Sequence, residues 1–123
     1  GSLYSLEFFR MCARRLKPGG LMCTWSPTPR THATFSRAFA HVVQLEAGQI
    51  LIGSNEPIAI DLAGWRSRLS SPAVAEYLGA EIRSQCLSSI ELVRPDTPRL
   101  VLSLPVNTDL WPLDEYQSPL ILP

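Results

Sequence analysis

A helix, a Pro-Gly-Gly turn and a short apolar strand follow one another at the start of this 123-residue chain. Apolar residues recur at helical spacing over residues 6–16 and Ser5 is a suitable N-cap, whereas Pro18 cannot continue the helix. The two glycines after Pro18 allow a tight reversal into residues 21–25. That near-continuous apolar run is typical of a strand covered on both faces, as in a parallel sheet. The pattern therefore predicts an α/β fold.

The next segments predict a second helix and a hairpin. Residues 31–41 carry apolar side chains at helical spacing. Residues 42–45 and 49–52 are two short apolar runs on either side of a turn that contains Gly48. We expect these two runs to pair as antiparallel strands.

The second half of the chain predicts short helices. Asp61 is placed to cap a helix that ends near Leu69, and Pro72 is placed to open another that ends near Leu78. Residues 87–93 are apolar enough for a further helix, while residues 99–104 fit either a strand or a helix. From residue 105 onward the chain is rich in proline and irregular. We expect one domain over residues 3–123, divided into a core at 3–57 and a helical, Pro-rich extension at 58–123.

Composition excludes several classes of partner. Eleven basic residues balance eleven acidic ones, so charge gives no reason to expect binding to nucleic acid or to a membrane surface. No apolar run approaches the ~18 residues of a membrane-spanning helix. The three cysteines, Cys12, Cys23 and Cys86, lack metal-binding spacing and read as reduced thiols. We therefore predict a cytoplasmic chain without a metal site.

Several segments, in order along the chain, resemble one family. Residues 3–9, 16–20 and Trp25 resemble the "LYS-EFY … RLxPGG … QW" stretch of spermidine synthase-like proteins. Residues 39–42 are similar to their "FPHV", and residues 52–57 to their "IGSDEP". The tail from Asn107 to Tyr116 resembles "NTDxxPxxEY". One departure is Thr24, which stands where the family has Gln, and it weakens any inference that a polyamine is held at that position.

The resemblance implies the C-terminal half of a Rossmann-like, methyltransferase-type sheet, in which the last strand inserts antiparallel. Such aminopropyltransferase or methyltransferase domains bind S-adenosylmethionine or its decarboxylated form. Their glycine-rich loop, ribose-binding acid and catalytic Asp precede the part that this chain matches, so the resemblance assigns no catalytic or cofactor-binding residue here. We expect the chain to be inactive alone and to hold no cofactor, although the parent is a transferase. In long bacterial forms of the family the synthase domain follows a membrane bundle.

Three residues are the best candidates for a substrate-binding edge: Tyr4, Thr24 and Trp25. Thr24 and Trp25 end the first strand, and ligands of open α/β sheets bind at the carboxyl ends of strands. The alternative is that Trp25 belongs to the core and Tyr4 packs at the helix entry. His32 and His41 have no partner at catalytic or metal spacing. The acidic residues Asp109, Asp114 and Glu115 are typical of a solvated tail or a structural turn. We expect the side chains of Asn107 and Asp109 to form hydrogen bonds with nearby backbone groups.

Two classes of function remain open. The chain is either a fragment of a transferase or a non-catalytic binding, assembly or regulatory module on the same scaffold. A half sheet would leave backbone groups unpaired along residues 21–25. We expect a homodimer through this exposed sheet edge, and the alternative is that residues 99–104 fold back and cover it.

Overall fold

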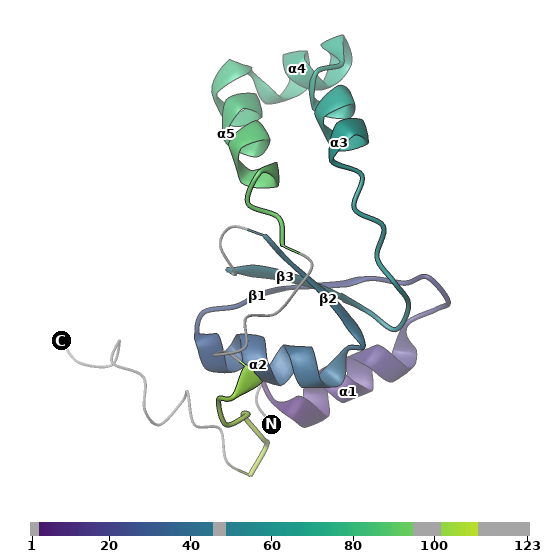
Figure 1. The fold of residues 1–123 in the computed structure, drawn as a ribbon, viewed down its shortest axis with the longest axis vertical. Coiled ribbons are helices and arrows are strands. Elements are labelled where there is room, and N and C mark those ends of the chain that lie inside the picture. The colour runs from purple at the N-terminus through teal and green to yellow at the C-terminus, as the bar shows by residue number, and fades with distance from the viewer. Residues whose placement is uncertain (1–2, 46–48, 95–101, 111–123) are drawn as a thin grey trace, which may run out of the picture.

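The computed structural model of the chain describes residues 3–45, 49–94 and 102–110. The elements in these residues are α1 (Leu6–Arg15), β1 (Met22–Trp25), α2 (Pro29–Ala38), β2 (His41–Leu45), β3 (Ile50–Ser54), α3 (Leu62–Leu69), α4 (Pro72–Leu78) and α5 (Ala80–Ile90). In Figure 1, α1 and α2 lie on one side of a small sheet, and α3, α4 and α5 project from the other side as an arm. Within the described residues, no helix has the length and apolar character needed to cross a membrane.

The first helix and its turn form for the reasons that the sequence suggests. The Ser5 hydroxyl accepts a hydrogen bond from the Phe8 amide at 3.2 Å, which satisfies one of the free donors at the N-terminus of α1. After Pro18, Gly19 takes a φ of 72°, a conformation that side chains with a Cβ rarely adopt. The chain then turns directly into β1.

The three strands form one sheet in the order β1-β3-β2. The predicted hairpin is confirmed: β2 pairs antiparallel with β3, from His41 opposite Ser54 to Leu45 opposite Ile50. β3 also pairs antiparallel with β1, so β1 and β2 run in the same direction on either side of it. The described residues therefore combine helices with a sheet, as expected of an α/β chain. Both strand pairs of this sheet are antiparallel, so it is not the parallel sheet that the sequence predicted.

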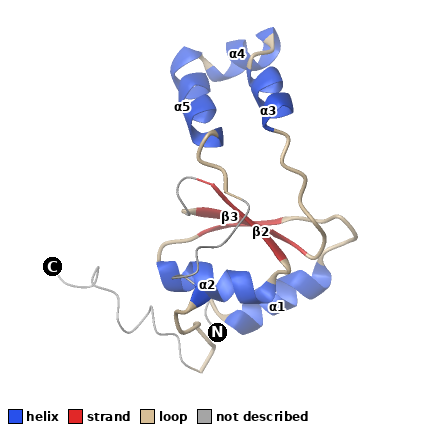
Figure 2. Cartoon of the chain, in the orientation of Figure 1, coloured by secondary structure: helices blue, strands red, loops and turns tan. Residues whose placement is uncertain are grey.

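The core lies between the sheet and the two helices that cover it (Figure 2). Phe9 of α1 meets Phe35 of α2 edge to face at a centroid distance of 5.1 Å, and Phe35 stacks with Phe39 at 4.5 Å. Leu51 of β3 is fully buried in the same cluster. Gly53 lies beneath the rings of Phe35 and Phe39, where its missing side chain leaves them room.

The opposite face of β1 is exposed, and the prediction that this strand is covered on both faces is wrong. Thr24 is opposite the buried Leu51, so its side chain shares the helix-covered face. Cys23 and Trp25 alternate with it and are exposed, Trp25 to 61%. None of the described helices packs on this second face of β1 in Figure 1, which explains the exposure.

Among the described residues, Arg94 covers the centre of the outer edge of β2. Arg94 exchanges two backbone hydrogen bonds with Gln44, at 2.9 and 3.0 Å. Val93, just before it, is 7% exposed. The segment that leaves α5 therefore returns to the sheet and blocks further pairing at this edge.

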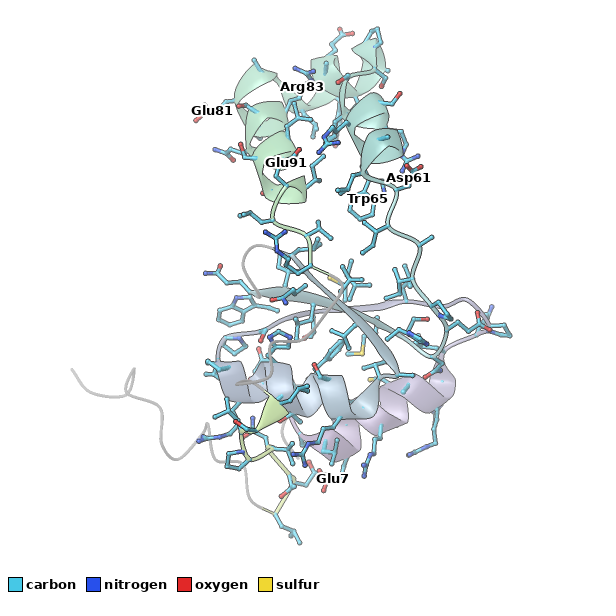
Figure 3. All side chains as sticks on the ribbon, viewed as in Figure 1. Glu7, Asp61, Trp65, Glu81, Arg83 and Glu91 are labelled. Atoms are coloured by element: carbon cyan, nitrogen blue, oxygen red, sulfur yellow. The ribbon has the colours of Figure 1, made fainter. Side chains whose placement is uncertain are left out.

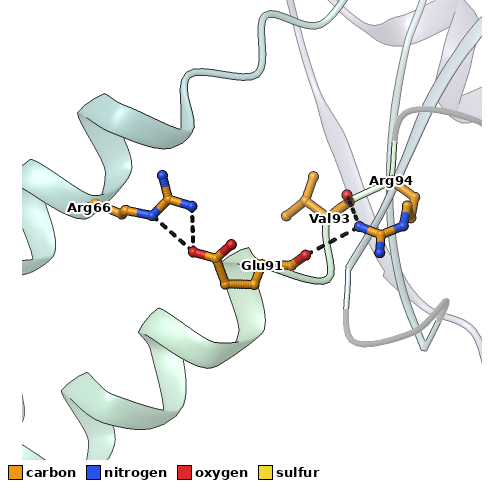
Figure 4. A network of polar contacts seen from close by, with 4 residues as sticks. All are labelled: Arg66, Glu91, Val93 and Arg94. Atoms are coloured by element: carbon orange, nitrogen blue, oxygen red, sulfur yellow. Dashed lines mark hydrogen bonds and ion pairs between the residues drawn. The ribbon is translucent and has the colours of Figure 1, made fainter.

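Polar contacts join the helices of the arm, on which Figure 3 labels Arg83 and Glu91. Arg83 of α5 donates to the Leu69 carbonyl at 2.9 Å and to the Ser70 hydroxyl at 3.1 Å, where α3 ends. At the base of the arm, Arg66 donates to the Glu91 carboxylate, and Arg94 donates to the carbonyls of Glu91 and Val93 (Figure 4). These contacts link the arm to the segment that pairs with β2.

The predicted helix boundaries hold in part. The helices that begin after Asp61 and at Pro72 are confirmed, including the bond from the Gly64 amide to the Asp61 carboxylate at 2.9 Å. The helix predicted over residues 87–93 begins earlier and ends at Ile90. The second helix ends at Ala38, and His41 belongs to β2 instead. Residues 99–101 of the ambiguous segment lie outside the described residues.

Candidate functional site

The structure separates the side chains of the three predicted site residues. Thr24 and Trp25 point to opposite faces of the sheet, because they are neighbours on one strand. The Thr24 hydroxyl donates to the Trp25 carbonyl at 3.2 Å. Tyr4 is half-buried and packs against the aromatic core. The packing alternative therefore describes Tyr4, while Trp25 is exposed and lies outside the core.

Hydroxyl groups collect where β1 ends and α2 begins, which we call the β1–α2 corner (residues 26–34). The Ser26 hydroxyl donates to the Thr28 carbonyl at 3.2 Å. Thr28 is the N-cap of α2: its Oγ1 accepts from the Thr31 amide at 3.1 Å and contacts the Thr31 hydroxyl at 3.1 Å. Pro29 at the first helical position needs no donor there. The corner is thus a rigid, polar start to α2 at the carboxyl end of β1.

A distant segment closes over this corner. The Asn107 amide donates to the Thr34 hydroxyl at 2.9 Å, and the Asn107 carbonyl accepts from the Leu6 amide at 2.8 Å. Asn107 is only 1% exposed. Two residues later, the Asp109 amide donates to the Glu7 carboxylate at 3.0 Å. These three bonds use main-chain groups of Asn107 and Asp109, and they tie the last described segment to α1 and α2.

His32 is the most unusual polar residue of the corner. Its side chain belongs to α2 and the residue is 4% exposed. Among the described residues its Nε2 atom is buried without a hydrogen-bond partner. Burial lowers the pKa of His32 below its usual value, because the charged imidazolium would lose its hydration. A neutral imidazole is therefore held inside the fold at neutral pH.

Sequence reasoning missed this property of His32. The pattern around it shows a polar histidine between Thr31 and Ala33 and gives no partner at catalytic spacing. The structure shows that five consecutive residues of α2, 31–35, are all buried. Helical periodicity predicts one buried face only, so this burial on all sides could not be found from the spacing.

A hollow lies within the arm. It has a volume of about 430 Å³ and opens between α3, α4 and α5. Its lining is almost entirely apolar: Trp65, Arg68, Leu69, Val74, Cys86 and Ile90. Such a lining suits an apolar group, but it presents few polar atoms that could orient a substrate.

The described residues do not assemble a metal site or an acid–base pair at the β1–α2 corner or in the hollow of the arm. No group of three metal-ligating side chains occurs among residues 3–45, 49–94 and 102–110. The hydroxyls of the corner bond to neighbouring groups of the corner itself. These hydroxyls are therefore already engaged with each other and with nearby carbonyls, and the described residues of the corner present no assembled acid–base pair.

No protein-family model, curated protein or solved structure matches this chain.

Proposed function

We propose that this chain is the C-terminal part of a spermidine synthase-like aminopropyltransferase or methyltransferase-type domain, and that it is inactive by itself. In this proposal the catalytic acid and the cofactor loop belong to a preceding part of the parent protein. The chain described here supplies the end of the sheet, the β1–α2 corner and the arm. The cytoplasmic location stays a prediction.

The position of β3 carries the proposal. The chain runs helix, strand, helix, strand, strand, and its last strand inserts between β1 and β2, antiparallel to both. This is the arrangement with which a methyltransferase-type sheet ends. Both helices that precede the hairpin lie on one side of the sheet, and the arm projects from the other side (Figure 1).

Contacts between the segments that resemble the family add support. Ser54, in the segment like "IGSDEP", donates to the carbonyl of Gly20 in the Pro-Gly-Gly turn at 2.9 Å. Asn55 of the same segment donates to the Ala13 carbonyl at 2.7 Å, near the end of α1. Asn107, in the segment like the family tail, bonds to the backbone of Leu6. Residues that resemble one family at distant points of the sequence thus interact directly.

The residues of this chain do not fit either cofactor. A nucleotide-type cofactor needs a glycine-rich loop that opens a helix, so that backbone amides can approach it closely. The loop between β1 and α2 reads Ser26-Pro27-Thr28-Pro29, which has no glycine and lacks two amide donors. We therefore assign no step of the reaction to a cofactor bound by this chain alone.

Within a complete domain, this chain would contribute a wall of the substrate site. Aminopropyl transfer needs a carboxylate that holds a cationic amine and a surface that keeps the reacting groups in line. In the proposal, the acid comes from the parent. The exposed Trp25 and the β1–α2 corner supply the surface, at the carboxyl end of β1, while the Thr24 side chain lies on the opposite, helix-covered face.

The coding sequence upstream of Leu3 tests the proposal. We expect it to encode a glycine-rich loop after a strand, and an Asp directly before Leu3. A reading frame without these features would contradict the transferase parent and favour the module.

An activity assay tests the second half of the proposal. The purified chain, incubated with putrescine and decarboxylated S-adenosylmethionine, should yield no more spermidine than a control without protein. Turnover above that control would show that the chain carries a complete site and would overturn the claim of inactivity.

A second candidate function is a non-catalytic assembly module. The observation that favours it is the exposed apolar surface in and next to β1, where Trp25 is 61% and Leu21, just before the strand, 57% exposed. Large apolar side chains at a strand edge favour association with another chain.

A further inference from the structure

The three helices of the arm form the walls of its apolar hollow. The lining residues on α3 are three or four positions apart, as are those on α5, so each helix contributes one face. α4 crosses the far end of the arm between them (Figure 1). The lining consists of Trp65, Arg68, Leu69, Val74, Cys86 and Ile90. All six residues belong to one continuous described segment, so the walls of the hollow lie entirely within residues 62–90.

The arm has no packed interior of its own. No residue of α3, α4 or α5 is fully buried. Trp65, Leu69 and Val74 are half-buried around a volume of about 430 Å³, which lies in the range of ligand pockets, about 300–1,000 Å³. An apolar group that entered the hollow would remove these side chains from water and fill the space between the helices.

Arg68 is the charged residue of the lining, and its guanidinium is available to a ligand. The other arginines of α3 and α5 are engaged, because Arg66 pairs with Glu91 and Arg83 donates to the Leu69 carbonyl. The exposed Arg68 side chain makes no hydrogen bond or ion pair within the described residues. No acidic side chain is among the residues that line the hollow. A cation therefore stands beside an apolar surface without a counterion in the described part of the chain.

We propose that the hollow binds an amphipathic monocarboxylate, with its apolar chain between the three helices and its carboxylate on Arg68. A planar guanidinium donates two parallel hydrogen bonds to a carboxylate, which suits a ligand with a single acidic group. The apolar lining disfavours a ligand with a polar body, such as a sugar phosphate, because its hydroxyls would lose their hydrogen bonds to water. This site is independent of the proposed transferase parentage.

Decanoate, kept below the concentration at which it forms micelles, is the probe, and decanol is its uncharged counterpart. Isothermal titration calorimetry should show that both bind to the wild-type chain. Arg68→Gln should weaken decanoate binding about fivefold, as expected for one exposed ion pair, and leave decanol binding unchanged. Arg68→Lys should bind decanoate more tightly than Arg68→Gln does. The matched control is Arg37→Gln, which removes an exposed charge from α2 and should change neither affinity.

The rate of thiol alkylation places the ligand in the hollow. Cys86 is half-buried in the lining, and Cys23 on β1 is exposed far from it in the sequence and serves as an internal control. Decanoate at about ten times its Kd should slow the reaction of Cys86 with iodoacetamide about tenfold, since only the unoccupied fraction reacts. The reaction of Cys23 should be unchanged. Mass spectrometry measures both rates, and circular dichroism confirms that each variant is folded.

The proposal predicts a specific combination of results, and several outcomes would overturn it. These are a wild-type chain that does not bind decanoate, an Arg68→Gln variant in which the affinities for decanoate and decanol change equally, and equal protection of Cys86 and Cys23. A hollow filled by a second copy of the chain would also overturn it, and would be seen as self-association in sedimentation equilibrium together with a lack of decanoate binding.

Discussion

Replacing Gly53 by alanine tests how closely the helices pack on the sheet. Gly53 lies on the central strand, on the face covered by α1 and α2. A Cβ atom there would stand 2.6 Å from Cγ of Phe39 and 2.7 Å from two ring atoms of Phe35. Carbon atoms in contact normally stay about 3.5–4.0 Å apart. Both rings would therefore have to move by about 1 Å inside a buried cluster.

The magnitude follows from two opposing effects. Overpacking a core costs about 1–3 kcal/mol, and two buried rings in contact with one Cβ place Gly53→Ala at the upper end. Alanine gains about 0.5–1 kcal/mol over glycine in the interior of a strand, because it loses less backbone entropy on folding. We expect the free energy of unfolding to fall by about 2 kcal/mol, a large part of the stability of a small domain.

Urea unfolding followed by circular dichroism measures this loss. The control is Gly79→Ala, where φ is 80°, ψ is 161° and no atom lies within 4 Å, so that about 1–3 kcal/mol is lost through backbone strain alone. Phe39→Leu makes room near Gly53. The loss of unfolding free energy caused by Phe39→Leu should therefore be about 1 kcal/mol smaller in the Gly53→Ala background than in the wild-type chain. A Gly53→Ala variant as stable as the wild-type chain would refute the packing argument.

Three further predictions concern polar residues. Thr34→Val should cost about 1–3 kcal/mol in urea unfolding, because it leaves the buried Asn107 amide without its acceptor, whereas Thr34→Ser should be nearly neutral. Ser5→Ala should cost about 1 kcal/mol through loss of the cap on the Phe8 amide. Burial lowers the pKa of His32 in the folded state, so that as pH falls the unfolded chain is protonated at His32 before the folded chain is. The free energy of unfolding should therefore fall as pH drops from about 7.5 to 5.5, and His32→Gln should weaken this pH dependence.

Local signals in the sequence predicted most of the individual elements. Ser5 and Asp61 cap helices because their side chains reach amides three residues ahead, and this depends on neighbouring residues alone. The hairpin followed from two apolar runs and a turn. The prediction that β1 is covered on both faces failed, because an apolar run cannot reveal whether a partner exists for each face. That depends on segments far from β1 in the sequence.

The candidate site could be predicted less well. The prediction for Tyr4, Thr24 and Trp25 depended on their position at the ends of sequence elements. Because side chains alternate along β1, those of Thr24 and Trp25 lie on opposite faces of the sheet. Asn107 bonds to Thr34, which is 73 positions away in the sequence, and to Leu6, which is 101 positions away. No local sequence pattern encodes contacts between residues so far apart. The burial of His32 likewise depends on tertiary packing.

The short bridge between Gln44 and Arg94 has a consequence for the size of any assembly. If both outer strands of the sheet were free, β1 of one molecule could add to β2 of the next, and head-to-tail growth would give a filament. With the outward backbone groups of Gln44 already bonded to Arg94, the β2 edge cannot accept such a strand along its full length. Arg94 thus protects this edge against the addition of further strands, and Arg94→Pro, which removes its amide donor, should make the chain more prone to self-association in sedimentation velocity.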